Sequence, residues 1–111
     1  MTEILYDTKY RPILLTQHPN ADLDYVVDFS VILDKFADGD TISSFTITST
    51  RGITIYSTGN DDYAVQFWAK DGSAGNSYII VVEIVTVNGR TIPFELVLPV
   101  GYTQQVLNTY S

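Results

Sequence analysis

Acidic residues gather in two short stretches of the sequence and are the first candidates for chemistry. Asp34, Asp38 and Asp40 lie in one predicted loop, and Asp61 and Asp62 lie in another. An EF-hand calcium loop needs acidic or amide groups at its first, third and fifth positions, a glycine at its sixth and a glutamate at its twelfth. The stretch that begins at Asp34 lacks this pattern. We therefore expect solvated turns and predict neither a metal site nor a cofactor.

A catalytic site is equally hard to assemble from this sequence. His18 is the only histidine and lies beside Pro19 in a predicted turn, and no serine stands in the G-x-S-x-G pattern of a nucleophile elbow. Glycoside hydrolysis needs two carboxylates that face each other across a cleft, and no such pair is indicated. The glycine-rich stretch 72–75 precedes no predicted helix whose N-terminus would bind phosphate. We predict that the protein is not an enzyme.

Aromatic residues offer a different chemistry, the stacking of sugar rings. The chain has one tryptophan, eight tyrosines and five phenylalanines. In a strand, Phe67 and Trp68 point to opposite faces, so at least one of them belongs to an ordinary core. Carbohydrate binding stays open as an alternative, which exposure of Trp68 would support and burial of Trp68 would oppose.

Length and charge limit the possible partners. A chain of 111 residues is one domain, and thirteen acidic against six basic residues give a net charge of −7. This charge argues against nucleic acid or an anionic membrane as the partner. The sequence has no cysteine, no apolar run near the ~20 residues of a membrane span, and no secretory signal over residues 1–7. We expect a soluble protein made in the cytoplasm and stabilised by packing alone.

Among the secondary-structure elements that would position any site, the clearest prediction is a β-hairpin over residues 77–98. Two runs of β-branched and aromatic residues flank the turn pair Asn88-Gly89, and the even positions of both runs form apolar rows. A two-residue loop would place Glu83 opposite Phe94 and bury a carboxylate. A shift of one residue aligns the two rows and requires a bulge near the turn, which costs less, so we predict the shifted register. The odd positions are largely apolar too, so a second layer or a partner must cover that face.

The sequence predicts further short strands before the hairpin. We predict them at residues 23–31, 41–49, 53–57 and 63–69, with a polar loop at 34–40. Turn signals recur roughly every 8–12 residues and no segment has a helical period, which predicts an all-β sandwich.

The two ends of the chain differ from this pattern. Pro12 and a turn cluster interrupt residues 1–22, which resemble an arm more than a core element. We therefore expect an N-terminal arm at residues 1–22, a sandwich at 23–99 and a C-terminal tail at 100–111.

Four blocks of residues occur in a characteristic order between residues 25 and 98. They are Tyr25-Val-Val-Asp-Phe-Ser30, Leu33 with Asp38-Gly-Asp-Thr-Ile42, Asp71-Gly-Ser-Ala-Gly-Asn-Ser-Tyr78, and Ile84-Val-Thr-Val-Asn-Gly-Arg-Thr91. Together they resemble a family of small immunoglobulin-like proteins of tailed bacteriophages, described as fiber-tail adaptor or tail-attachment proteins. Phe29 stands where that family usually has a tryptophan, a change that keeps a similar volume.

This resemblance implies an immunoglobulin-like β-sandwich of about seven strands with extended N- and C-terminal arms. It implies a virion structural protein, made in the host cytoplasm, that joins the tail or connector to fibers through multivalent contacts. We expect its partners to be other virion proteins and further copies of itself. A capsid decoration or cement protein on the major capsid protein is one alternative, and a carbohydrate-binding host-attachment module is another.

The arms supply the predicted contacts between chains. An extended arm can add a strand to a neighbouring sheet, because main-chain hydrogen bonds provide the attachment. We expect residues 1–16 to do this on an adjacent subunit. The predicted interface residues are the apolar and aromatic side chains of both arms: Ile4, Tyr6, Tyr10, Ile13, Leu15, Tyr102, Val106 and Leu107.

Overall fold

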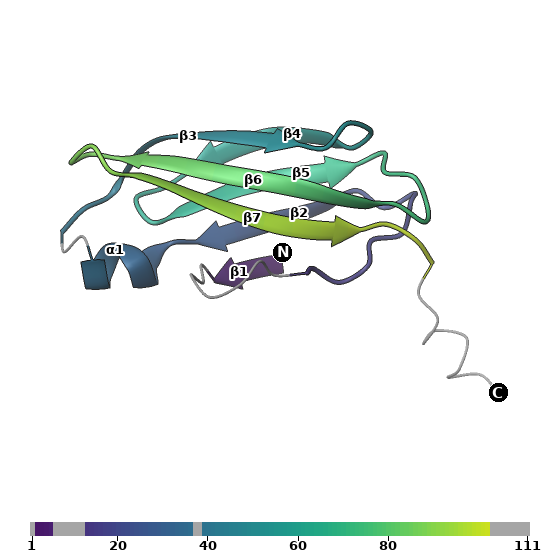
Figure 1. The fold of residues 1–111 in the computed structure, drawn as a ribbon, viewed down its shortest axis with the longest axis horizontal. Helices are drawn as coiled ribbons and strands as arrows, with labels where there is room; N and C mark the ends of the chain where they lie inside the picture. Colours follow the sequence, from purple (N-terminus) through teal and green to yellow (C-terminus); the bar gives the residue numbers. More distant parts are fainter. Residues whose placement is uncertain (1, 6–12, 37–38, 103–111) are drawn as a thin grey trace.

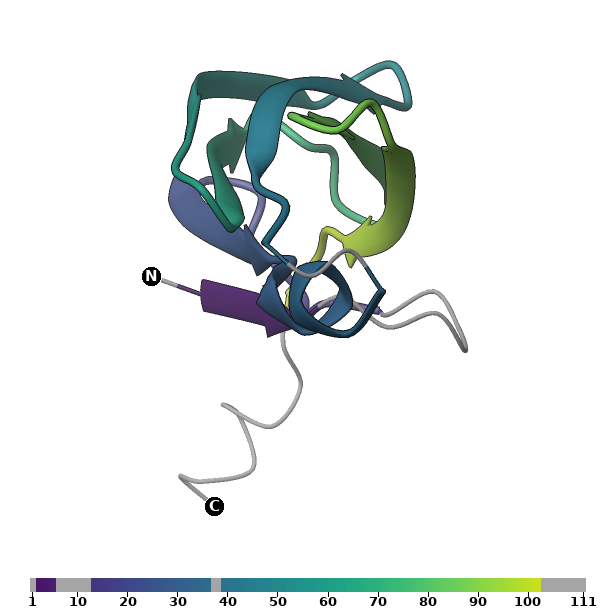
Figure 2. The ribbon, with the colours of Figure 1, turned by 90° about the vertical axis from the view of Figure 1, so that its left-hand side faces the viewer.

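Two facing β-sheets enclose the core of the protein (Figure 1, Figure 2). The computed structural model describes residues 2–5, 13–36 and 39–102. Sheet A has the strand order β1-β2-β5-β4 and consists of β1 (Thr2–Leu5), β2 (Leu23–Asp28), β5 (Ala64–Lys70) and β4 (Thr54–Asn60). Sheet B has the order β3-β6-β7 and consists of β3 (Ile42–Ser49), β6 (Ser77–Thr86) and β7 (Thr91–Pro99). The predicted all-β sandwich is confirmed.

The order of the strands is that of constant-type immunoglobulin domains, in which four strands read ABED and three read CFG. The pair β1–β2 departs from the antiparallel sheets of such domains, because β1 runs parallel to β2. A helix also lies between β2 and β3 in the chain. The two-layer sandwich is therefore established, and the immunoglobulin-like class stays a prediction.

Alternating side chains build the core between the sheets. In β5, Val65 and Phe67 have no exposed surface, whereas Trp68 between Phe67 and Ala69 points outward. The ring of Tyr25 in β2 stacks on Phe67 with 5.4 Å between centroids. The large side chains without exposed surface are Val27, Phe29, Leu33, Val65, Phe67, Ile80, Val82, Ile84, Leu96 and Leu98.

The β6–β7 hairpin adopts the shifted register. Val82 pairs with Phe94, and Glu83 pairs with Pro93. Both even rows therefore face the core, and Glu83 lies on the outer face of sheet B, half-buried. The shifted register, which we predicted because burying the Glu83 carboxylate would be costly, is confirmed.

The loop of this hairpin contains the expected bulge. The Thr86 N–H donates to the Arg90 carbonyl at 2.8 Å, and the Gly89 N–H donates to the Thr86 carbonyl at 3.0 Å. The loop thus has three residues in place of the two suggested by Asn88-Gly89 alone. Gly89 takes a φ of 87°, the left-handed conformation that closes a three-residue hairpin loop.

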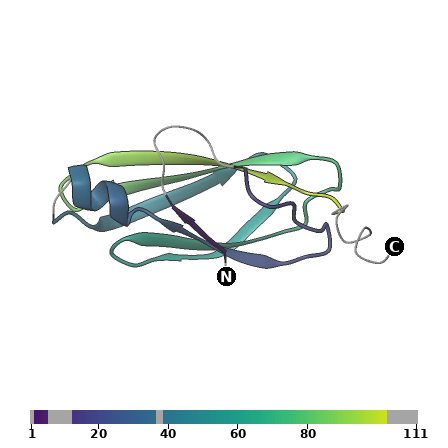
Figure 3. The same ribbon diagram turned by 90° about the horizontal axis from the view of Figure 1, so that it is seen from below.

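The helix α1 (Ser30–Phe36) replaces the end of a predicted strand and part of a predicted loop. The Asp28 carboxylate accepts a hydrogen bond from the Ser30 N–H at 2.8 Å, and the Leu33 N–H donates to the Phe29 carbonyl at 3.1 Å. The chain therefore turns after Phe29 and returns Leu33 to the core, while Val31 is left 43% exposed. The strand prediction through residue 31 is wrong, and α1 lies at one end of the sandwich (Figure 3). With seven residues it is too short to span a membrane, and the described chain has no longer helix.

Candidate protein-interaction surfaces

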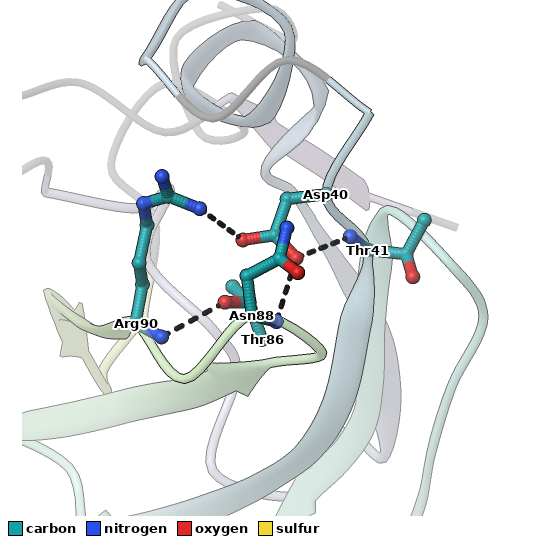
Figure 4. Close-up of polar contacts among 5 residues, drawn as sticks. All are labelled: Asp40, Thr41, Thr86, Asn88 and Arg90. Atoms are coloured by element: carbon teal, nitrogen blue, oxygen red, sulfur yellow. Dashed lines mark hydrogen bonds and ion pairs between the residues drawn. The ribbon is translucent and has the colours of Figure 1, made fainter.

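Among the acidic side chains that the structure describes, only Asp40 is buried, with 1% of its surface exposed. Its Oδ2 accepts a hydrogen bond from the Arg90 guanidinium at 2.8 Å, and its Oδ1 accepts from the Thr41 and Asn88 N–H groups at 3.0 and 3.1 Å (Figure 4). Burial by itself raises the pKa of Asp40. Hydrogen bonds from Thr86, Arg90 and the two backbone amides outweigh it, so the pKa lies below its usual value.

These contacts give Asp40 a structural role. They join the segment before β3 to the loop between β6 and β7, two parts of the chain that are 50 residues apart. Both carboxylate oxygens are occupied by donors of the same chain. The expectation of a solvated turn is wrong for Asp40. The residues that the structure describes contain no group of three or more His, Cys, Asp or Glu side chains that could hold a metal ion.

His18 also makes structural contacts. Its Nδ1 accepts a hydrogen bond from the Asn20 N–H at 3.0 Å. Its ring meets Tyr102 edge-on, with 5.0 Å between centroids and an angle of 83° between the planes. These contacts link the turn before β2 to the last described residue of the chain.

Residues 13–17 run along the outer edge of β7. The Leu14 N–H donates to the Val97 carbonyl at 2.8 Å, and the Gln17 N–H donates to the Pro99 carbonyl at 2.9 Å. The Gly101 N–H returns a hydrogen bond to the Gln17 carbonyl at 3.0 Å. The bridges are parallel, so this segment extends sheet B beyond β7.

The side chain of Gln17 anchors this segment to the sandwich. It is 3% exposed, donates to the carbonyls of Ala69 at 2.9 Å and Ala21 at 3.1 Å, and accepts a hydrogen bond from the Tyr25 hydroxyl at 2.6 Å. Burial, with a contribution from the charge of Asp24, raises the pKa of Tyr25 to about 12, which keeps its hydroxyl protonated. The end of the predicted N-terminal arm is therefore fixed to the core.

Apolar side chains lie exposed beside one another at this edge of sheet B. Ile13 pairs with Val97, and Val97 pairs with Ile79 of β6, so the three share the outer face. Ile13 is 74% exposed, Leu15 86% and Ile79 38%, and Val97 is half-buried. We call Ile13, Leu15, Ile79 and Val97 the edge patch. Ile79 and Val97 were absent from the predicted interface, although the apolar odd positions of the hairpin were a signal for them.

Three predicted interface residues are exposed in the structure. Ile13 and Leu15 belong to the edge patch, and Tyr102, 65% exposed, lies against His18. Ile4 is instead 7% exposed and lies opposite Val27, within the chain's own sheet A. The described parts of residues 1–16 thus pair with the chain's own sheets, and their pairing with an adjacent subunit stays a prediction. The remaining predicted residues lie outside the described ranges: Tyr6, Tyr10, Val106 and Leu107.

A second cluster lies on the outer face of sheet A. Trp68 is 36% exposed, and its ring lies 6.3 Å from that of Tyr56 at an angle of 39°. The Lys70 Nζ lies 4.9 Å from the centroid of the Tyr56 ring. The Tyr56 hydroxyl donates to the Asp22 carboxylate, and this hydrogen bond is the main reason that the pKa of Tyr56 is raised to about 12. The exposed face of Trp68 is therefore framed by an aromatic ring and two charged groups.

The family model described as "Podophage GP4 fiber-tail adaptor protein gp77" matches residues 17–99, which are 83 of the 111 residues. None of the curated proteins compared with the chain matches it. The matched region holds both sheets except β1 and includes the Gln17 anchor. The chain therefore belongs to the family of podophage GP4 fiber-tail adaptor proteins.

Proposed function

We propose that the protein joins the tail or connector to the fibers and that the edge patch is one of its contact surfaces. Membership of the family makes the chain a structural component of the virion whose partners are other virion proteins. The observation that carries the proposal is the exposure of Ile13 beside Val97 and Ile79 on sheet B, with Leu15 also exposed two residues further along the same segment. Adjacent exposed apolar side chains mark protein-interaction sites.

An adaptor needs separate surfaces for the two structures that it joins. The edge patch lies on sheet B, and the cluster around Trp68 lies on the outer face of sheet A. Several copies around the tail would repeat each contact. Linked contacts of this kind give an avidity well beyond the affinity of one contact.

Paired serine substitutions at Ile13 and Leu15 test the edge patch. Binding of the purified chain is measured by co-sedimentation with isolated tail complexes, with fibers and with emptied capsid shells. The native chain is expected to bind tail complexes. The double variant should bind at least about tenfold more weakly, because burying one aliphatic side chain contributes ~1.5–3 kcal/mol and about 1.4 kcal/mol corresponds to tenfold.

Val87→Ser is the matched control for this experiment. Val87 is 67% exposed and lies in the β6–β7 loop, away from the edge patch. Its substitution should leave the affinity for tail complexes unchanged. Equal binding by the double variant and the native chain would remove the edge patch from the proposal. Binding to capsid shells alone would favour a decoration protein.

Carbohydrate binding is a second candidate function, which the exposure of Trp68 favours. An exposed aromatic face beside hydrogen-bonding groups is suited to stack a sugar ring. Calorimetric titration with purified O-antigen polysaccharide tests it, with Trp68→Ala as the variant and Tyr63→Ala, at an exposed aromatic outside the cluster, as the control. Heat of binding that only Trp68→Ala abolishes would support this function. The absence of binding heat with the native chain would exclude this polysaccharide.

A further inference from the structure

The edges of the two sheets are protected to different degrees. Residues 13–17 cover β7, β1 has only four residues, and β4 is interrupted by a register shift between Tyr56 and Gly59, where Ser57 has a φ of 51°. The strand β3 has eight residues with no charged side chain and no proline, and in the described part of the chain it pairs only with β6. Proteins normally block such an edge, because its free main-chain groups bind another strand. β3 is therefore the open edge of this sandwich.

The main-chain groups that face this open edge follow from the ladder. The Thr50 N–H donates to the Ile79 carbonyl in β6 at 3.0 Å, and the register from Ser44 to Ser49 continues without a shift. Main-chain groups alternate in direction along an antiparallel strand. The N–H and C=O groups of Phe45 and Ile47 therefore point outward, where an added strand would meet them.

The side chains of β3 match this arrangement. Phe45 and Ile47 lie opposite Ile84 and Val82, which are fully buried, yet Phe45 and Ile47 themselves are only half-buried. Thr46 lies between them on the exposed outer face. An additional strand beside β3 would cover the exposed parts of both apolar side chains.

We propose that the β3 strands of two copies pair antiparallel about a two-fold axis at Thr46. Phe45 then lies opposite the partner's Ile47, so apolar side chains meet and the outward main-chain groups exchange both hydrogen bonds. Ser44 lies opposite the partner's Thr48, so hydroxyl groups meet on the outer face. This register uses residues 44–48 and avoids the bulge between Ile42 and Ser44.

A second copy is the occupant because β3 is complementary to itself. A two-fold interface needs one surface that fits its own rotated copy, and the uncharged β3 brings no like charges together. The biological role of this pairing, the assembly of adaptor copies, rests on the proposed adaptor function. It would merge two copies of sheet B into one sheet with β3 at its centre and an edge patch near each end.

Single cysteine substitutions in the full chain report this register directly, because the sequence has no cysteine. Across the axis, Thr46 forms a pair without hydrogen bonds, with Cα atoms about 4.5 Å apart, which is within disulfide reach. Thr46→Cys should therefore form a covalent dimer on mild oxidation, seen by intact mass and on non-reducing gels. Dimer formation should be at least about tenfold faster than for Thr58→Cys, an exposed position on β4, because pairing raises the effective thiol concentration.

Two more variants distinguish this register from random collision. Ser44→Cys and Thr48→Cys should each form no covalent dimer alone, since the two copies of the same cysteine lie roughly 14 Å apart along the paired strands. A mixture of the two should form the crosslinked heterodimer. Equal rates for Thr46→Cys and Thr58→Cys, or faster dimer formation by Ser44→Cys or Thr48→Cys alone, would overturn the proposal.

A charge at the axis provides an independent measurement. Thr46→Lys places two ammonium groups side by side and should convert the native dimer to a monomer by solution mass, whereas Thr58→Lys should not. A native chain that is monomeric at all concentrations would overturn the proposal. Neither assay contains tails or fibers, so the outcome is read separately from the adaptor function.

Discussion

At the scale of single residues, Asp40 links the acid stability of the fold to one contact. Its hydrogen bonds hold its pKa below the value of an unfolded aspartate, which is about 3.9. The folded state therefore binds fewer protons than the unfolded state as the pH falls. The stabilisation from this carboxylate is present above about pH 4 and is lost as the pH falls through the lower pKa of the folded protein.

Asp40→Asn is expected to lower the Tm at pH 7 by about 5 °C or more, because it weakens the contacts to Arg90 and the two amides. The difference from the native chain should begin to shrink below about pH 4, where the unfolded carboxylate takes up a proton, and should shrink further as the pH falls through the lower pKa of the folded protein. Thermal unfolding followed by circular dichroism from pH 7 to pH 3 measures both effects. Asp62→Asn, at an exposed position, is the control. A Tm difference that does not change with pH would contradict the role of the charge.

The contact between Asp40 and Arg90 is of a kind that local sequence patterns cannot predict. Asp40 lies among other aspartates in a polar stretch, and its partner Arg90 is 50 residues away. No local spacing connects the two residues. Side-chain alternation within one strand, by contrast, correctly places Phe67 inside and allows Trp68 outside.

At the scale of elements, the helix α1 and the hairpin differ in how far local rules determine them. The hairpin follows from two alternating runs and the cost of burying Glu83. The same alternation rule does not reveal the helix. Phe29 and Leu33 are four residues apart, and residues at this spacing lie on the same face in a strand and also in a helix. Only Val31, inward in the predicted strand and exposed in the helix, distinguishes the two.

Two alanine substitutions in α1 should therefore differ strongly. Leu33→Ala removes a side chain with no exposed surface and should lower the free energy of unfolding by about 2–5 kcal/mol. Val31→Ala should change it by less than about 0.5 kcal/mol, because Val31 is largely at the surface. Urea denaturation of both variants gives the comparison. Similar losses at the two positions would indicate a strand in place of the helix.

The predicted core shows a related limit. Alternation along the predicted strand 41–49 turns Phe45 and Ile47 toward the core, yet both stay half-buried. Alternation gives the face of a strand and not its place in the sheet. That β3 lies at an edge follows from strand order, which depends on contacts between distant parts of the chain.

At the scale of the whole molecule, the net charge of −7 opposes any contact between copies. The proposed β3 pair contains no charged side chain that would offset this repulsion. Raising the ionic strength from 0.01 to 0.15 M shortens the Debye length from about 30 Å to about 8 Å. The dimer fraction measured by light scattering should therefore rise with salt. A dimer that dissociates as salt is added would point to ion pairs between the copies and against β3.

The class of protein follows from four blocks that all lie within residues 25–98, and the family match covers nearly the same region. The surfaces were less predictable. Ile13 acquires apolar neighbours only because the N-terminal segment lies along β7, and the sequence does not reveal that adjacency. Sequence alone thus identified the family and half of the patch.

The hydrogen bond between Gln17 and Pro99 has a consequence for how such a chain can be rearranged. The family match begins at residue 17 and ends at residue 99, and these two residues are in contact at 2.9 Å. The two ends of the matched region therefore lie next to each other. A short linker from Pro99 to Gln17 would allow a circularly permuted chain with new termini at the turn between β3 and β4. In the chain with its natural order, segments grafted before Gln17 and after Pro99 would leave the sandwich at the same place.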